Sequence, residues 1–344
     1  MKKLIKCLLA LSLTLFTLPM GGCSMFQKNQ TELYQLAPEQ NSLMQSYVIK
    51  TAKNKLIVID GGIDGEGLHA NPYLPSALRS IAGVNEGEYF EVEAWFLTHA
   101  HEDHFYELAK MLKEYNSESN YKINHFYFDF PDVYLSELIG ELQAGLDNYA
   151  SINNIEVKKN SFYDDLNGSV VNANSIENGL EFEIDNVRIE VLQTWADSDS
   201  ADTNSNSQVL RFWVDGQSIL FLGDLGLAGE DRLLSGKYKD SLKSDIVQMA
   251  HHGQRGVSET AYKAFDAKVH LWPTPIWVWY NGDKYYQIDE VREWLYGATF
   301  YDANANNIVS CLYEAYPKDP TKVADWNEVI DGMKITLPYK PKAE

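Results

Sequence analysis

Residues 94–104 read AWFLTHAHEDH, an apolar strand that runs directly into three histidines and an aspartate. Side chains in a turn at the end of a strand lie where α/β proteins place ligands and active sites. Imidazole and carboxylate groups together suit a borderline divalent ion such as zinc, manganese or iron. Without a metal ion, so short a turn would bring side-chain dipoles of the same orientation and a desolvated charge close together. We therefore predict a metal site and not a merely polar loop. The candidate ligands are His99, His101, Asp103 and His104.

Hairpins and helices alternate around this stretch. We predict hairpins over residues 46–60, 180–195 and 208–223, helices over 73–82, 104–115 and 132–149, and strands over 91–97, 124–130 and 245–250. The Asp215-Gly216 pair strongly favours a tight turn in the third hairpin. Hairpins mixed with helices indicate an α/β layered sandwich rather than a purely parallel sheet.

The 344-residue chain is long enough for one large domain, and its 45% hydrophobic content supports a substantial core. We find no internal linker and no short-period repeat, so residues 41–344 are predicted to form a single catalytic domain. The formal net charge of -20 argues against a protein that binds nucleic acid over its whole surface. Three cysteines are too few for a disulfide framework or a thiolate-rich metal site.

The first residues are typical of a targeting segment. Three lysines at positions 2, 3 and 6 precede an apolar run over residues 7–18 that is too short for a lasting membrane span, which predicts a secretory signal. The following LPMGGC, which ends at Cys23, resembles a bacterial lipoprotein signal, and an ordinary cleavable signal is the alternative. The resemblance implies a signal peptide over 1–22, a lipid anchor on Cys23, a tether over 23–40, and an extracytoplasmic chain anchored to the bacterial cell membrane.

The His-x-His-x-Asp-His motif over 99–104 resembles the signature of the metallo-β-lactamase-fold hydrolases. Other parts of that family's pattern follow in the same order: IVIDGG over 57–62, FLGD over 221–224 and HHG over 251–253. The histidine motif is highly specific, whereas the shorter motifs are weak alone and strong in this order. The resemblance spans residues 45–275 and implies a four-layer αββα sandwich of the metallo-β-lactamase type.

The same resemblance implies a site for two divalent metal ions, zinc first, with manganese or iron as alternatives. Its metal ligands in this sequence would be His99, His101, Asp103, His104, Asp224 and His252. His99 and His101 would bind metal one. Metal two would be bound by Asp103, His104 and a histidine of the 251–252 pair, and Asp224 would bridge the two metals. Asp60 would support the ligands from behind. We favour His252 as the ligand, so His251 would face the substrate. The catalytic candidates are Asp103 and His251.

The chain departs from the family at one ligand. Many members have a third histidine on metal one, but no histidine lies between His125 and His251, and His125 falls inside a predicted strand, where a structural role is expected. The segment 203–210 at this place reads TNSNSQVL. It is similar to the hydrolase domain of competence DNA-uptake channels, a branch in which that histidine is also absent. An oxygen ligand or water would then hold metal one.

These residues predict a surface-anchored hydrolase that cleaves a phosphodiester or related ester by attack of a metal-bound hydroxide. The substrate would be an anionic ester. A choline or sugar group on it could rest on Trp277 and Trp279, whose period-two spacing predicts one face of a strand. Core packing is the alternative for these aromatics.

Two other functions stay open. The first is an extracellular nuclease of the DNA-uptake type, which would need a local basic groove; the candidates to form one are Arg211, Arg232, Lys243 and Arg255. The second is a surface binding protein that keeps the fold without catalysis. Nucleic acid is therefore an unexpected partner but not an excluded one, because the fold does not choose the substrate.

Overall fold

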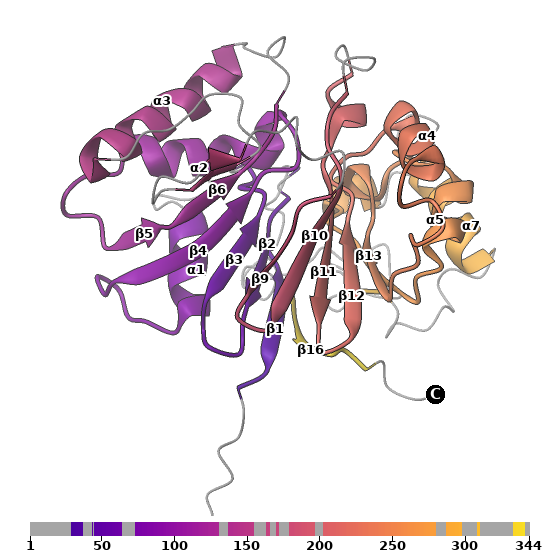
Figure 1. Cartoon of the computed structure of the whole chain (residues 1–344), viewed down its shortest axis with the longest axis horizontal. Coiled ribbons are helices and arrows are strands. Elements are labelled where there is room, and N and C mark those ends of the chain that lie inside the picture. Colours follow the sequence, from indigo (N-terminus) through magenta and orange to yellow (C-terminus); the bar gives the residue numbers. More distant parts are fainter. Residues whose placement is uncertain are drawn as a thin grey trace, which may run out of the picture.

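Two β-sheets pack face to face, and each carries helices on its outer side (Figure 1). The computed structural model describes residues 29–36, 43, 45–63, 73–130, 137–154, 163–165, 170–171, 179–196, 202–279, 287–297, 308–309 and 333–340. The predicted four-layer αββα sandwich is confirmed. The predicted signal peptide over 1–22 lies outside the described residues.

The first sheet is mixed. Its strand order is β16 (Met333–Leu337), β1 (Thr31–Gln35), β2 (Tyr47–Lys50), β3 (Leu56–Ile59), β4 (Phe90–Phe96), β6 (His125–Tyr127), β7 (Tyr163–Asp165) and β8 (Val170–Val171), with β5 (Tyr121–Ile123) also paired to β4. Strands β2 and β3 form the predicted hairpin, and β3 and β4 run parallel with Ile59 opposite Phe96. In the described part of the chain, the helices beside this sheet are α1 (Tyr73–Ala82), α2 (Glu102–Lys113) and α3 (Glu137–Asn153).

The second sheet combines an antiparallel meander with parallel strands. Its order is β15 (Ile308–Val309), β14 (Val269–Leu271), β13 (Ile246–Gln248), β12 (Gln217–Phe221), β11 (Val209–Val214), β10 (Val187–Gln193) and β9 (Glu181–Ile184). The predicted hairpins β9–β10 and β11–β12 are both present, and β12 to β15 run parallel. The helices of this half are α4 (Leu227–Ser235), α5 (Glu259–Phe265), α6 (Ile276–Trp279) and α7 (Ile288–Tyr296).

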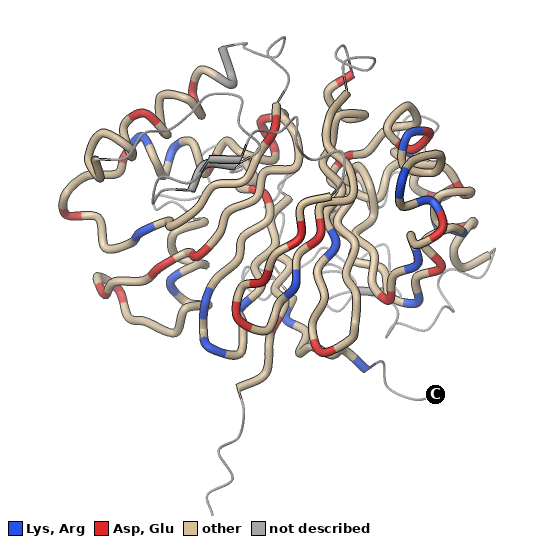
Figure 2. Tube along the Cα trace, in the orientation of Figure 1, with Lys and Arg blue, Asp and Glu red and all other residues tan. Residues whose placement is uncertain are grey.

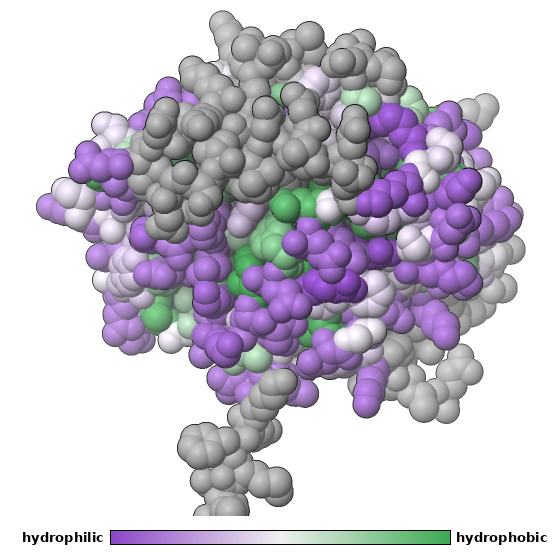
Figure 3. Space-filling view, viewed as in Figure 1, coloured by the Kyte–Doolittle hydropathy of each residue, from purple (hydrophilic) through white to green (hydrophobic). Residues whose placement is uncertain are grey.

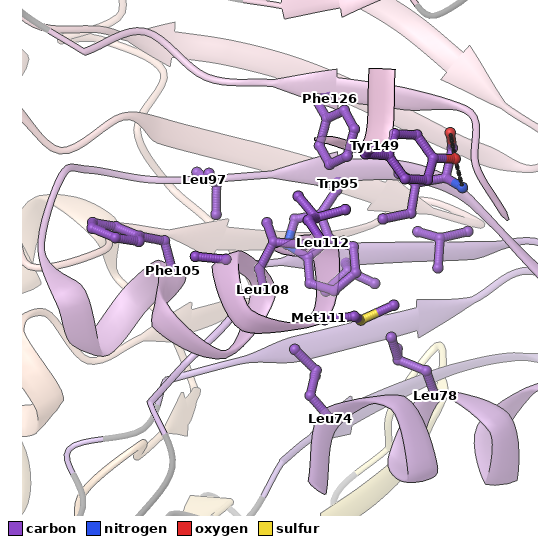
Figure 4. Close-up of a cluster of buried hydrophobic side chains, with 14 of the residues drawn as sticks. Leu74, Leu78, Trp95, Leu97, Phe105, Leu108, Met111, Leu112, Phe126 and Tyr149 are labelled. Carbon is purple, nitrogen blue, oxygen red and sulfur yellow. Dashed lines mark hydrogen bonds between the residues drawn. The ribbon is translucent and has the colours of Figure 1, made fainter. Parts of the chain in front are cut away.

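Three apolar layers hold the sandwich together. Central strands are buried on both faces, so LIVI in β3 is a continuous apolar run in which Val58 faces the helices and its neighbours Ile57 and Ile59 face the other sheet. Figure 4 shows the outer layer, in which leucines of α1 and α2 pack on Trp95. A third layer lies between the second sheet and α4, α5 and α7. Among the described residues on the face seen in Figure 3, hydrophilic ones predominate.

Strand β1 corrects the predicted start of the domain. The range 23–40 was expected to be a tether and the domain to begin at residue 41, yet Thr31–Gln35 pairs with β2 and β16 inside the first sheet. Its alternate residues Thr31, Leu33 and Gln35 are buried. Two of these three are polar, so the strand lacked the apolar alternation that predicts one.

Helix α2 also begins earlier than predicted, at Glu102 instead of His104. Its first turn holds Glu102 and Asp103, and negative charge is favourable at the N-terminal end of a helix. The metal motif therefore spans a loop and the first turn of a helix. No helix within the described part of the chain has both the length and the apolar character needed to cross a membrane.

Candidate metal centre

The site residues lie just after the ends of four strands. Asp60 directly follows β3, the histidine motif follows β4, Asp224 is the third residue after β12, and the 251–252 histidine pair follows β13. Because β3 runs parallel to β4 and β12 runs parallel to β13, these ends lie at matching edges of the two sheets. Hydrogen bonds between the segments, such as His252 Nε2 to Asp103 Oδ2 at 2.9 Å, join the two edges.

The predicted ligands gather in two groups. The first group is His99, His101 and Asp224, and the second group is Asp103, His104, Asp224 and His252. Within each group the ligand atoms all lie within 4.8 Å of one another. Both groups contain Asp224, whose carboxylate lies 3.9 Å from His99 Nε2 and 3.1 Å from His104 Nε2. A carboxylate shared between two groups of ligands could bridge two neighbouring metal ions.

The chemistry of the groups fits divalent metal ions. Nitrogen and carboxylate oxygen are ligands of zinc and of related transition metals. His99 is almost fully buried, yet its Nε2 has no hydrogen-bond partner in the described part of the chain, an unusual state for a buried polar atom. A metal ion beside Nε2 would provide the missing partner. Among the described residues, the second group offers four ligand residues and the first group three.

The two ligand groups differ in the pKa values of their histidines. Burial lowers the pKa of His99 and of His101, so both rings are neutral near pH 7. Burial opposes the charged form of His252 too, but the carboxylates of Asp224 and Asp103 outweigh it and raise the pKa of His252 to about 9. The pKa of His104 rises for the same kind of reason. A metal entering the second group must therefore displace protons, whereas the first group is ready to bind.

Asp60 orients the histidine motif through hydrogen bonds to Thr98 and His104. It is fully buried and accepts hydrogen bonds from Thr98 N at 2.7 Å, from Thr98 Oγ1 at 2.9 Å and from His104 Nδ1 at 2.8 Å. Because Nδ1 of His104 faces Asp60, its Nε2 faces Asp224. Asp60 itself has a φ of 62°, in the left-handed region that a β-strand cannot continue, so the chain turns at this residue.

Backbone contacts fix Asp224. The Gln248 side chain accepts from Leu222 N at 2.8 Å and donates to Gly223 O at 3.0 Å, and Ser207 Oγ accepts from Asp224 N at 3.1 Å. Gly223 has a φ of +55°, and a Cβ there would lie 2.7 Å from Thr98 Oγ1. Glycine is therefore required where the two sheets meet. No local pattern marked Gln248, since Leu222 and Gly223, the residues it holds beside Asp224, lie more than twenty residues away in the sequence.

The turn after β13 separates the roles of the two histidines. His251 and His252 have φ values of 52° and 57°, and Gly253 continues the left-handed run at 80°. Strained backbone of this kind concentrates at functional sites. The turn buries His252 in the second group and leaves the His251 side chain 33% exposed, 4.0 Å from Asp224 Oδ2. Thr274 Oγ1 supports the turn by donating to the His252 carbonyl at 2.5 Å.

The predicted aromatic platform is wrong for Trp279. Trp277 and Trp279 lie in the short helix α6 and not in a strand, so a spacing of two does not put them on one face. Trp279 is buried against Trp272, and the Arg292 guanidinium covers its ring at 4.2 Å. The helix follows Pro275, a residue favoured at helix starts, and that signal outweighs the period-two pattern. His125 lies in β6 outside both ligand groups.

The family model of the metallo-β-lactamase superfamily matches residues 45–269. The chain belongs to the metallo-β-lactamase superfamily. No curated protein matches it.

Several superfamily structures are similar to this chain. The metallo-β-lactamase-fold protein YhfI from Bacillus subtilis is 13% identical over 72% of this chain and 87% of its own, with a TM-score of 0.38. A diphosphatase of the PhnP family is 13% identical over 71% and 86%, with a TM-score of 0.40. The short form of human tRNase Z is 15% identical over 70% and 91%, with a TM-score of 0.38.

Proposed function

We propose that this superfamily member is a dinuclear metal-dependent hydrolase that cleaves a phosphodiester or a related ester. The observation that carries the proposal is the pair of ligand groups sharing Asp224. Zinc is the expected metal, with manganese or iron as alternatives, because the ligands are nitrogen and carboxylate oxygen and none is a thiolate. Two such ions, when bound, would polarise an ester oxygen and activate a water molecule.

The side chains around the groups suit an anionic substrate. Asp103 and Asp224 are held ionised: burial opposes this, but the neighbouring His104 and His252 outweigh it and lower the pKa of both carboxyl groups. The two carboxylates would bind the divalent metal ions but neutralise only part of their positive charge, which leaves a net positive charge for an anionic substrate. His251 is partly exposed beside Asp224, and burial lowers its pKa, so its neutral ring can offer an N–H to a substrate oxygen.

The distribution of basic residues favours a small ester over DNA. Arg211 donates to Glu190 at 2.6 Å, Lys243 to Asp266 at 2.8 Å, and Arg232 to the Ser205 carbonyl at 2.9 Å, while Arg255 lies 3.8 Å from Glu290. Each cation predicted to line a basic groove thus has a partner of its own. Figure 2 shows Lys and Arg scattered among Asp and Glu over the described trace.

We also propose that the protein is lipid-anchored at Cys23 outside the bacterial cell membrane, after removal of residues 1–22. The support is the order of three lysines, a short apolar run and a cysteine at 23. Mass spectrometry of the N-terminal peptide from detergent-extracted protein is the test. A diacylglycerol mass on Cys23, lost in Cys23→Ser, supports the anchor, and an unmodified Cys23 or a different cleavage site contradicts it.

The activity is tested with a substrate panel. Bis(p-nitrophenyl) phosphate, p-nitrophenylphosphorylcholine and DNA are offered to the chain loaded with zinc, manganese or iron. We expect metal-dependent hydrolysis of a phosphodiester that Asp103→Ala abolishes and that Asp147→Ala, an exposed control on α3, leaves intact. Cleavage of DNA alone, with a steep loss of binding in salt, would establish the nuclease instead. Absence of metal and of hydrolysis would establish a binding protein.

A further inference from the structure

We propose that Thr98 is a positioning residue that relays the orienting effect of Asp60 to His99, so that one carboxylate orients a ligand in each metal group. Asp60 acts on His104 of the second group directly and on His99 of the first group through the Thr98 hydroxyl. The inference rests on the proposed dinuclear site and adds the residue that prepares metal one.

The first step concerns the protons around Asp60. Thr98 N can only donate, and it lies 2.7 Å from Oδ1. The Thr98 hydroxyl and His104 Nδ1 lie 2.9 Å and 2.8 Å from Oδ2. Thr98 N and the Thr98 hydroxyl both donate to the Asp60 carboxylate, one to each oxygen. The Thr98 hydroxyl proton is therefore directed toward Asp60.

The second step follows from the chemistry of a hydroxyl, which has one proton and two acceptor lone pairs. Thr98 Oγ1 also lies 3.1 Å from His99 Nδ1. Since the hydroxyl proton points to Asp60, Oγ1 accepts at this contact, and the proton between them belongs to His99 Nδ1. With that proton on Nδ1, the ring lone pair lies on Nε2, the atom that has no hydrogen-bond partner among the described residues and lies 3.9 Å from Asp224 Oδ2.

The third step is that the hydroxyl cannot easily move away. Thr98 is fully buried, and Gly223 packs so closely on it that a Cβ at 223 would lie 2.7 Å from Oγ1. In the opposite tautomer, the His99 N–H would occupy Nε2 and block the metal. Thr98 would then have to turn its proton away from Asp60, giving up a charge-assisted hydrogen bond.

The relay predicts an asymmetric effect. Loss of the Thr98 hydroxyl removes the acceptor for His99 Nδ1–H but leaves the Asp60–His104 contact in place. Metal one should therefore weaken while metal two is retained. Partners of ligands at this distance typically contribute 10–100-fold to metal affinity, so we expect a loss of about that size at one site alone.

Three variants test this. Thr98→Val keeps the shape and removes the hydroxyl, and Thr98→Ser keeps the hydroxyl. Ser46→Ala is the matched control, because the buried Ser46 hydroxyl donates to the Asp60 carbonyl at 3.0 Å without touching the carboxylate. Zinc titration by calorimetry should give two sites in the wild type, in Thr98→Ser and in Ser46→Ala. In Thr98→Val one site should weaken about 10–100-fold and the other should change less than about threefold. Equal loss at both sites, or the same loss in Ser46→Ala, would overturn the relay.

A second readout does not depend on metal. Nitrogen-15 NMR of the histidine rings in metal-free protein at pH 7, with His99 assigned through His99→Gln, should show the proton on Nδ1 in the wild type and in Thr98→Ser. A proton on Nε2 in the wild type would refute the relay even if Thr98→Val fails to fold. A wild type that binds fewer than two ions but shows Nδ1–H would count against the dinuclear function and not against the relay.

Discussion

Gln248→Glu is the sharpest test of how the Asp224 loop is held. The fully buried Gln248 amide accepts from Leu222 N at 2.8 Å and donates to the carbonyls of Gly223 at 3.0 Å and Met249 at 2.6 Å. Glutamate has the same shape but no second donor, and its ionised form would face two carbonyl oxygens. The carboxyl group therefore stays protonated in the folded state, with a pKa raised above the ordinary value of about 4.3.

The magnitude follows from these contacts. A protonated glutamate has one donor for two carbonyls, so one hydrogen bond is lost, at about 1 kcal/mol. Because the folded state retains a proton that the unfolded state releases, stability falls by about 1.4 kcal/mol for each pH unit above about 4.3. We expect the variant to be less stable than the wild type by about 2 kcal/mol at pH 5 and about 5 kcal/mol at pH 7.

Urea unfolding of the metal-free chains at pH 5 and pH 7 measures this difference. The control is Gln193→Glu, whose amide also donates to a carbonyl, that of Gly229 at 3.0 Å, but which is only half-buried. Water can hydrate that carboxylate, so its stability difference should not depend on pH. A Gln248→Glu difference that is the same at both pH values would refute the reasoning.

Three further outcomes are expected. Burial raises the pKa of Asp129 to about 6, so Asp129 should contribute a loss of up to about 3 kcal/mol as pH rises from 4 to 8, measured by urea unfolding as the change with pH in the stability difference between the wild type and Asp129→Asn. Gly61→Ala would put a Cβ 2.7 Å from Leu108 Cβ on α2; it should cost about 1–3 kcal/mol and weaken zinc binding, whereas Gly140→Ala, with open space around it, should do neither. Zinc at about 100 times its Kd should add about 2.7 kcal/mol per site to the stability, seen as a rise in Tm that a chelator reverses.

Local patterns predicted an α/β layered sandwich, the hairpin turns and the four ligands of the His-x-His-x-Asp-His motif, because strand ends and that spacing are local signals. Asp60, Asp224 and His252 were predicted by resemblance, from the family's shorter motifs. The contacts of Gln248 and Thr274 could not, since they join segments that are distant in sequence. Thr98 directly precedes the His-x-His-x-Asp-His motif, but its role depends on where Asp60 and His99 lie in space.

The wrong predictions have physical causes as well. Strand β1 is built from TELYQ, where polar side chains occupy the buried positions, so no apolar alternation marked it. Trp279 sits in a helix that begins after Pro275, and its ring is covered by Arg292. For β1, tertiary packing determined the outcome and the local pattern did not. For Trp279, a helix start after Pro275 competed with the period-two pattern.

Zinc anomalous diffraction from crystals of the loaded chain tests the central claim most directly. We predict two peaks about 3.5–4 Å apart. One should lie beside His99 and His101, the other beside Asp103, His104 and His252, with the Asp224 carboxylate between them. A single peak, or two peaks that do not share Asp224, would contradict the dinuclear account.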